Sequence, residues 1–231
     1  MPYLVQQYVR GARNALTAAF DGVEVHAANG CLLDQFIESS TNRRSDEYGG
    51  SIENRARLLM EVAEAVSDVW CADRAGLRLS PLGMMNDISD DDPETTFRHV
   101  AEKLNDYRLA YLHIINPAIA APEKEAEPEP RALRMLDRIR ERYQGILMIA
   151  GGFDRDTAEA WLEQGKADPF AFGRKFLANP DLPERFRSRA PLNAEDRSTF
   201  YGGGAKGYTD YPTLGQERGE QPRPCVDEHW R

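Results

Sequence analysis

A chain of 231 residues is long enough for one sizeable domain with its own core, and its composition is that of an ordinary globular protein. The net charge of −9 argues against a nucleic-acid surface and against binding to an anionic membrane, because both need clustered Lys and Arg. No apolar run approaches the roughly 18 residues that span a bilayer. The three cysteines lack the spacing of a disulfide framework or a zinc site, which favours a reducing cytoplasm.

The N-terminal segment is expected to form a helix. Its apolar residues recur at helical spacing: Leu4, Val5, Tyr8, Val9, Ala12, Leu16 and Ala19. This pattern is typical of an amphipathic helix packed on a sheet. The first 20 residues contain Arg10 and Arg13 and no acid, which loosely resembles a transit peptide, but the periodicity favours the packed helix.

Short apolar runs then alternate with helical stretches five times. The expected strands are 22–26, 76–80, 110–115, 146–150 and 169–172, and the expected helices between them are 51–69, 92–105, 131–142 and 154–164. Near-continuous apolar strands alternating with helices predict a parallel sheet covered by helices. Asp154 and Asp156 occupy positions suited to the start of the last of these helices.

Polar residues follow the strands, which indicates the kind of parallel sheet. They are His26, Ser80, Asn116, Gly151 with Gly152, and Gly173 with Arg174. No GxGxxG motif follows the first strand, so a doubly wound dinucleotide-binding fold is disfavoured. A TIM (β/α)8-type barrel is favoured, because its catalytic face lies at the carboxyl ends of the strands.

The number of strands predicts an incomplete barrel. A complete one takes roughly 250 residues and eight βα units, whereas five are visible here, with three expected to be missing from the N-terminal side. The predicted barrel portion is 1–214, and 215–231 is expected to be a disordered polar tail. The acidic, Pro-rich segment 120–130 is expected to be a surface loop. Two unpaired sheet edges would suit an oligomer or a partner chain that supplies strands.

The end of the first strand carries the candidate chemistry. A lone histidine there is more often structural, but His26 and Asn29 are three residues apart in a turn and can converge on one acceptor. Two neutral donors aimed at one oxygen suit a carbonyl or nitro group that gains negative charge during reaction.

Several motifs in this chain match one family in order. They are HAANGCLLDQF (26–36), DEYGGSIENRARL (46–58), GLRLSP (76–81), IAGGF (149–153), AFGR (171–174) and FYGGGAKGYTDYP (200–212). Together they resemble the old yellow enzyme family of FMN-dependent ene-reductases, in particular the branch of N-ethylmaleimide, morphinone and xenobiotic reductases. The resemblance covers residues 1 to about 214. Within it, 48–57 is expected to be structural, with Ser51 capping a helix.

The resemblance implies FMN as cofactor, NAD(P)H as reductant and a small activated alkene or nitro compound as substrate. It implies that His26 and Asn29 hold the electron-withdrawing oxygen of the substrate while hydride reaches the β-carbon. It places Arg78 against the N1/O2 edge of the flavin, where a positive charge stabilises the reduced cofactor.

The resemblance also assigns the remaining cofactor contacts. Gly151, Gly152 and Phe153 match one half of the phosphate cradle of the family, and Gly173 with Arg174 match the other half. Tyr201, next to Phe200, matches an aromatic residue that flanks the flavin or the substrate pocket. Glycines let backbone N–H groups approach a phosphate, and arginine adds a charge-assisted hydrogen bond.

One catalytic position departs from the family pattern. Cys31 stands where most members have the tyrosine that donates a proton to the reduced alkene. The shorter thiol side chain predicts that solvent or another group supplies this proton. Three readings stay open: an active FMN-dependent reductase, a truncated non-catalytic remnant that is inactive or needs a partner chain, and a barrel that binds a different phosphorylated ligand.

Overall fold

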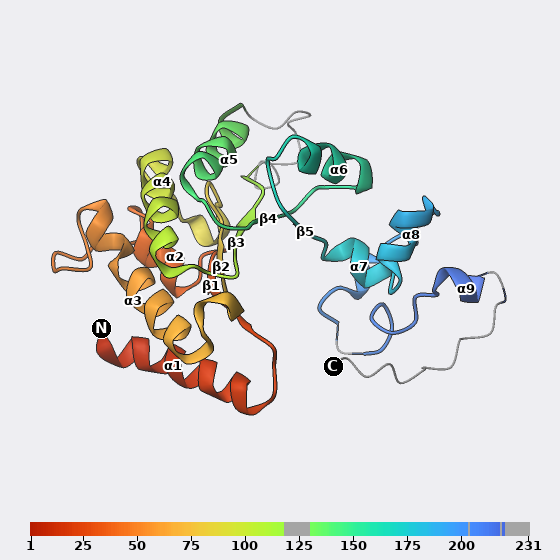
Figure 1. Ribbon diagram of the computed structural model, residues 1–231, viewed down its shortest axis with the longest axis horizontal. Helices are drawn as coiled ribbons and strands as arrows, with labels where there is room; N and C mark the ends of the chain where they lie inside the picture. The colour runs from red at the N-terminus through yellow and green to blue at the C-terminus, as the bar shows by residue number, and fades with distance from the viewer. Residues whose placement is uncertain (118–129, 203, 218, 220–231) are drawn as a thin grey trace. The chain divides into compact units, whose positions relative to one another are not determined.

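The computed structural model describes residues 1–117, 130–202, 204–217 and 219 (Figure 1). The chain divides into two units, Met1–Ala171 and Phe172–Arg231, and each is described by itself. This division falls inside the single barrel portion, 1–214, that the sequence predicts. The predicted loop at 120–130 lies outside the described residues except for Pro130, and so does the predicted tail beyond residue 219.

The first unit is built on a sheet of five parallel strands that follow one another in chain order (Figure 1). The strands are β1 (Val23–Ala27), β2 (Ala75–Leu79), β3 (Tyr111–Ile115), β4 (Leu147–Ala150) and β5 (Phe170–Ala171). Each expected strand is confirmed with its ends within about one residue of the predicted position. A sequential parallel order with a helix in each connection is the arrangement of consecutive βα units in a barrel.

One helix precedes the sheet and others fill the connections, as predicted except for the short helix at 32–37, which the sequence does not predict. They are α1 (Pro2–Thr17), α2 (Leu32–Ile37), α3 (Ile52–Trp70), α4 (Pro93–Leu104), α5 (Pro130–Arg142) and α6 (Arg155–Glu163), with single 3₁₀ turns η1 (Ala72–Arg74), η2 (Met85–Asp87) and η3 (Asn105–Tyr107). The Ser51 side chain caps α3 by accepting a hydrogen bond from the Asn54 amide. Asp154 and Thr157 form a reciprocal capping box at the start of α6. These caps satisfy backbone donors that a helix start leaves free.

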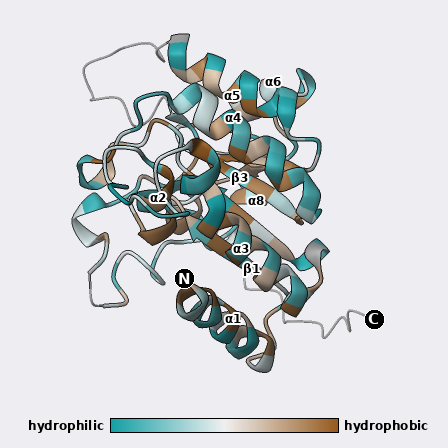
Figure 2. Cartoon of the chain, turned by 90° about the vertical axis from the view of Figure 1, so that its left-hand side faces the viewer, coloured by the Kyte–Doolittle hydropathy of each residue, from teal (hydrophilic) through white to brown (hydrophobic). Residues whose placement is uncertain are grey.

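The two faces of the sheet differ in polarity. Val25, Leu77, Leu112 and Leu147 occupy equivalent positions on four neighbouring strands, and all four are buried. Helix α3 contacts β1 and β2, and the helices carry alternating teal and brown bands, as amphipathic helices do (Figure 2). The opposite face carries polar residues, so the prediction of near-continuous apolar strands needs correction for β1 to β3. Only the residues that alternate onto the helix-covered face are uniformly apolar.

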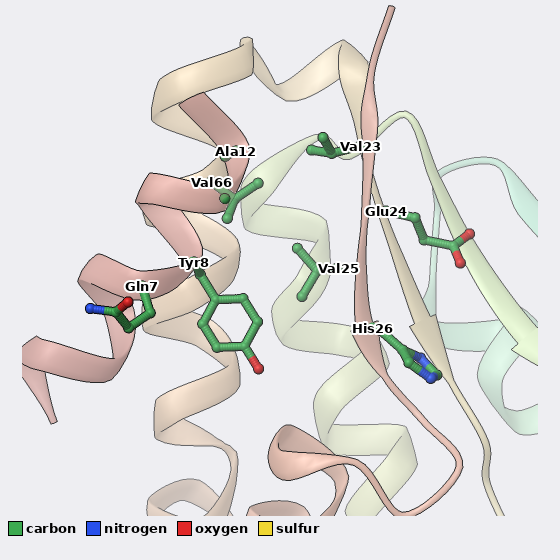
Figure 3. Close-up of a pocket in the computed structure, with 9 residues that line it drawn as sticks. Gln7, Tyr8, Ala12, Val23, Glu24, Val25, His26 and Val66 are labelled. Atoms are coloured by element: carbon green, nitrogen blue, oxygen red, sulfur yellow. The ribbon is translucent and has the colours of Figure 1, made fainter. Parts of the chain in front are cut away.

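The N-terminal helix forms as predicted but packs on a different element. Helix α1 contacts α3, and the indole nitrogen of Trp70 donates a hydrogen bond of 3.0 Å to the backbone oxygen of Ala12. A cavity of about 400 Å³ lies between α1 and β1, lined by residues that include Tyr8 and Val25 (Figure 3). The predicted packing of this helix on a sheet is therefore corrected to packing on α3. The apolar stripe reveals that a face is buried without revealing what covers it.

The second unit contains α7 (Arg174–Ala178), α8 (Leu182–Ser188), η5 (Arg197–Thr199) and α9 (Leu214–Glu217). Its centre is the fully buried Arg185. The guanidinium donates to Asp181, to the backbone oxygens of Pro191 and Pro212, and to Glu217. Helix α9 covers residues 215–217, the first three residues of the segment 215–231 that the sequence predicts to be disordered.

Within the described ranges, no helix is long and apolar enough to cross a membrane. The same residues contain no group of three or more His, Cys, Asp or Glu side chains that could hold a metal ion.

Candidate functional site

A row of polar side chains crosses the exposed face of the sheet. The register pairs His26 on β1 with Arg78 on β2, and Arg78 with His113 on β3. Equivalent positions on neighbouring parallel strands point to the same face of a sheet. Figure 3 shows Glu24 and His26 projecting from one side of β1 and Val25 from the other. The fold thus brings together three basic side chains that are far apart in the sequence.

A second row lies two residues closer to the start of each strand. It consists of Glu24 on β1, Gly76 on β2 and Tyr111 on β3. The Nδ1 atom of His113 lies 2.9 Å from Oε2 of Glu24, and Tyr111 hydrogen-bonds to the same carboxylate. Burial acts to raise the pKa of Glu24, but the hydrogen bonds and the nearby His113 and Arg78 hold it below its ordinary value. Glu24 is therefore a carboxylate at neutral pH and supplies negative charge beneath His26 and Arg78.

Arg78 has a buried polar atom that finds no partner among the described residues. Its Nε atom is inaccessible to solvent and makes no hydrogen bond there, and the same holds for Nε2 of His113. Buried donors without an acceptor are rare in folded proteins and call for an explanation. A bound ligand that presents an acceptor at this face would satisfy Arg78.

His26 is exposed at the end of β1 and has a lowered pKa. Partial burial is the main cause, and the positive charge of Arg78 adds to it, whereas Glu24 acts in the opposite direction. Both leading causes disfavour the imidazolium form. The side chain is therefore a neutral imidazole at pH 7, which can donate one hydrogen bond to a ligand without carrying a full charge.

Asn29 lies in a tight turn between β1 and α2. The backbone N–H of Cys31 donates to the oxygen of Ala28 at 3.1 Å, and Asn29 and Gly30 between them have φ angles of 57° and 73°. Two successive left-handed residues are typical of a type I′ turn, for which Asn-Gly is the preferred pair. Asn29 is half-buried and borders a cavity of about 330 Å³ that also touches Ser80 and Asn116. Cys31 is exposed at the start of α2.

The predicted phosphate-binding segment follows β4. Gly151 and Gly152 have φ angles of 108° and 78°, which L-residues with a Cβ rarely adopt. The Asn116 side chain donates a hydrogen bond of 3.2 Å to the Gly151 oxygen and orients this turn. Phe153 is buried, and its ring lies 4.9 Å from that of Trp161 and 4.5 Å from that of Phe170. This packing fixes the segment, so only its backbone is available to a phosphate.

The remaining predicted site residues belong to the second unit. Gly173 precedes α7, and a Cβ added there would meet open space. Arg174 is about half exposed and pairs with Glu195 at 3.6 Å. Tyr201 is almost fully exposed, and its backbone N–H donates to the hydroxyl of Tyr208 at 2.7 Å. These side chains are therefore accessible within their own unit.

Several polar residues of this face were not predicted as site residues. Glu24, Tyr111 and His113 line the sheet beside the predicted Arg78, and Asp34 contacts the turn of Asn29. The alternation of polar and apolar residues in VEVHA, and the single histidine in YLHII, are signals that could have identified the first three. The role of Asp34 depends on a contact across the fold and has no local signal.

Comparison with known proteins gives a consistent result. The profile of the NADH:flavin oxidoreductase / NADH oxidase family matches residues 2–193. Putative 12-oxophytodienoate reductase 10 of Oryza sativa subsp. japonica is 46% identical over 223 residues, which are 95% of this chain and 70% of the relative. A probable flavin mononucleotide-dependent alkene reductase of Leishmania infantum is 46% identical over 210 residues, 91% of this chain and 55% of the relative.

Solved structures give the same relationship. Morphinone reductase superposes with a TM-score of 0.86 at 46% identity, covering 94% of this chain and 56% of that protein. The old yellow enzyme homologue from Zymomonas mobilis superposes with a TM-score of 0.84 at 41% identity, covering 92% and 59%. These neighbours are TIM barrels, so the predicted fold class is confirmed, with five parallel strands in this chain. The chain spans between 54% and 70% of the length of the curated relatives it matches.

Proposed function

Because this chain belongs to the NADH:flavin oxidoreductase / NADH oxidase family, whose cofactor is FMN, we propose that it is an FMN-dependent oxidoreductase. In this proposal NAD(P)H is the reductant, and the substrate is the activated C=C bond of an enone or a nitro compound. The compartment is the cytoplasm, which the absence of disulfide spacing among the three cysteines supports.

The observation that carries the proposal is the row of His26, Arg78 and His113, in which the Nε atom of Arg78 has no partner in the described part of the chain. An orphaned guanidinium donor on the polar face of a barrel sheet fits an electron-rich acceptor such as the pyrimidine edge of a flavin. The positive charge of Arg78 favours negative charge on that edge. Glu24 below the row balances the charge of the arginine.

The phosphate of FMN would be held by backbone N–H groups at Gly151, Gly152 and Phe153. Positive φ angles at two successive glycines support this assignment, because they open the turn to close approach by an anion. The resemblance alone assigns Gly173 and Arg174 to the other half of the cradle; within its own unit, Arg174 is half-exposed. Tyr201 is likewise assigned to the flavin or substrate pocket by the resemblance alone, and within its own unit it is almost fully exposed.

When bound, FMN supplies the hydride that reduces the substrate. The residues at the end of β1 bind and polarise that substrate. His26 is a neutral donor because burial and Arg78 lower its pKa, and the Asn29 side chain adds a second neutral donor. Two such donors at one carbonyl or nitro oxygen stabilise the negative charge that develops there. Cys31 is exposed, so water reaches this position and can supply the proton that completes the reduction.

The proposal is tested on the purified full-length chain. We expect the chain to bind FMN, to show the yellow absorbance of an oxidised flavoprotein, to bleach with NADPH or NADH without oxygen, and to recover colour with 2-cyclohexen-1-one. His26→Ala and Asn29→Ala are expected to slow recovery by the enone by roughly 100-fold, as removal of an anion-stabilising donor does. His99→Ala is the matched control, because it removes a histidine of α4 that belongs to neither polar row.

Each other outcome points to a different reading. A chain that does not bind FMN would be a non-catalytic remnant or would need a partner chain. FMN binding without bleaching by either nicotinamide would contradict the oxidoreductase. Binding of another phosphorylated ligand in preference to FMN would favour a barrel with a different ligand and a different activity. An equal loss of the rate of reoxidation by the enone in His26→Ala and His99→Ala would contradict the proposed role of His26 in binding the substrate.

A further inference from the structure

The turn that carries Asn29 is held by two buried side chains from other elements. The backbone N–H of Asn29 donates to Oγ of Ser80 at 2.7 Å, and the N–H of Gly30 donates to Oδ2 of Asp34 at 2.9 Å. Ser80 itself donates to the same Asp34 oxygen at 3.1 Å. A continuous hydrogen-bonded path therefore runs from Asn29 through Ser80 to Asp34.

The path joins three parts of the fold. Asp34 lies in the first turn of α2 and is completely buried, and Ser80 directly follows β2 and is also buried. The Gln35 side chain adds a hydrogen bond of 2.7 Å to the oxygen of Gly30. The two central N–H groups of the turn thus face inward to fixed acceptors, while the Asn29 side chain borders the cavity.

The sequence of the turn suits its backbone, and the inward hydrogen bonds fix where it lies. Asn29 has a φ of 57°, a left-handed conformation that asparagine adopts more readily than other L-residues with a Cβ. Gly30 is enclosed, since a Cβ there would lie 2.9 Å from the backbone oxygen of Met85. Without the inward hydrogen bonds, the N–H groups of Asn29 and Gly30 would lose their acceptors and the turn could open.

We propose that Asp34 is a positioning residue that, directly and through Ser80, fixes the Asn29–Gly30 turn and so aims the Asn29 side-chain amide. The effect on substrate rests on the function proposed above, whereas the effect on the turn does not. Asp34 contacts no substrate atom in this role. It acts on the backbone through Oδ2, which accepts hydrogen bonds from Gly30 and Ser80. Its second oxygen, Oδ1, is buried without a hydrogen-bond partner among the described residues.

The charge of Asp34 gives the proposal a direct readout. Burial raises the pKa of this carboxyl to about 6, against the lowering effect of its bonds from Gly30 and Ser80. Glu38 is coupled to this carboxyl: burial and the charges of Asp34 and Asp90 raise the pKa of Glu38 to about 8, and Arg55 acts in the opposite direction. Glu38→Gln separates the two titrations, because it removes the carboxyl that interacts with Asp34.

The first test uses the FMN-free full-length chain and observes backbone amides by NMR. We expect the Gly30 amide proton to titrate with a midpoint near pH 6 in the wild type and to lose this titration in Asp34→Asn. Amide exchange at Asn29 and Gly30 is expected to rise about tenfold in Asp34→Ala and Ser80→Ala. Glu38→Gln is the matched control, because it removes a buried carboxyl group one turn away that makes no hydrogen bond to the turn among the described residues.

A Gly30 amide whose titration is unchanged in the conservative Asp34→Asn variant would overturn the proposal. Exchange in Asp34→Ala equal to that in Glu38→Gln would overturn it as well. Neither result depends on flavin binding or on turnover, so failure here differs from failure of the proposed function.

The second test uses the FMN-loaded chain after reduction with dithionite. Asp34→Ala is expected to slow reoxidation by 2-cyclohexen-1-one about tenfold and to leave reoxidation by dioxygen unchanged, because dioxygen does not need the Asn29 amide. Asp34→Asn, which keeps an acceptor oxygen, is expected to recover part of the rate. Equal slowing with both oxidants would indicate a structural role only and would overturn the positioning role.

Discussion

The Nδ1 atom of His113 on β3 lies 2.9 Å from Oε2 of Glu24 on β1, so a hydrogen bond spans the strand that separates them. The crossing is possible because Gly76 on β2 occupies the register position between Glu24 and Tyr111 and has no side chain. A Cβ at Gly76 would lie 2.5 Å from the ring of Tyr111. The glycine therefore makes room for the polar row that supports the site.

Gly76→Ala tests this relationship. The new methyl group must displace the Tyr111 ring or the strand, so we expect a loss of about 1–3 kcal/mol in the free energy of unfolding. Urea titration followed by circular dichroism measures the change. Gly11→Ala in α1 is the control, because a Cβ there meets nothing within 4 Å and alanine favours a helix by up to about 1 kcal/mol. A Gly76→Ala variant with the same free energy of unfolding as the wild type would show that Tyr111 has room to move.

Glu38 is expected to make the stability of the first unit depend on pH. Burial, together with the charges of Asp34 and Asp90, raises its pKa to about 8, while Arg55 acts in the opposite direction. The folded state therefore holds a proton that the unfolded state releases, and this stabilises the fold fully below the ordinary pKa of 4.5. The contribution is lost as the pH rises from 4.5 through 8.

Glu38→Gln removes this dependence. Relative to the wild type, the free energy of unfolding of the variant is expected to increase by up to about 1.4 kcal/mol per pH unit between pH 5 and 8. Urea titrations at several pH values measure it, and the exposed Glu47→Gln is the control. A constant difference between Glu38→Gln and the wild type across this range would contradict the expectation.

Arg185 is expected to determine the stability of the second unit. Its guanidinium is fully buried and is shared by Asp181, Glu217 and two backbone oxygens. Truncation in Arg185→Ala leaves Asp181 and these oxygens without their donor, and breaking a buried ion pair costs roughly 3–5 kcal/mol. Limited proteolysis of the second unit, read by mass spectrometry, measures the loss of protection.

Arg187→Ala is the control for that experiment. Arg187 pairs with Glu184 on the surface of α8, where both side chains are more than half exposed, and such pairs contribute roughly 1 kcal/mol or less. Equal sensitivity to protease in both variants would show that Arg185 does not hold the unit together.

Cys31 is expected not to supply the proton in alkene reduction. Its thiol is short and exposed at the start of α2, where water has access. Cys31→Ala is therefore expected to retain full reduction of an enone, measured as single-turnover reoxidation of the FMN-loaded, reduced chain. A large loss of this rate would instead make the thiol the donor.

The local elements could be predicted because their signals are local. The apolar run of each strand and the capping residues Ser51 and Asp154 depend on neighbours within a few positions. The partner of α1 could not be predicted, since its apolar stripe suits a sheet or a helix equally well. The prediction of irregular chain from residue 215 missed α9, because Glu217 is fixed by Arg185 from 32 residues away.

By itself, the sequence determined the order of strands and helices, the family motifs, and the residue types at the end of each strand, among them His26, Asn29 and Arg78. Only the tertiary structure decided that Arg78 lies between His26 and His113, and that Asp34 and Ser80 lie beneath the Asn29 turn. The physical reason is that strand register and buried hydrogen bonds join residues about 50 positions apart in the chain. Their geometry follows from how the helices and the sheet pack together, which no local pattern records.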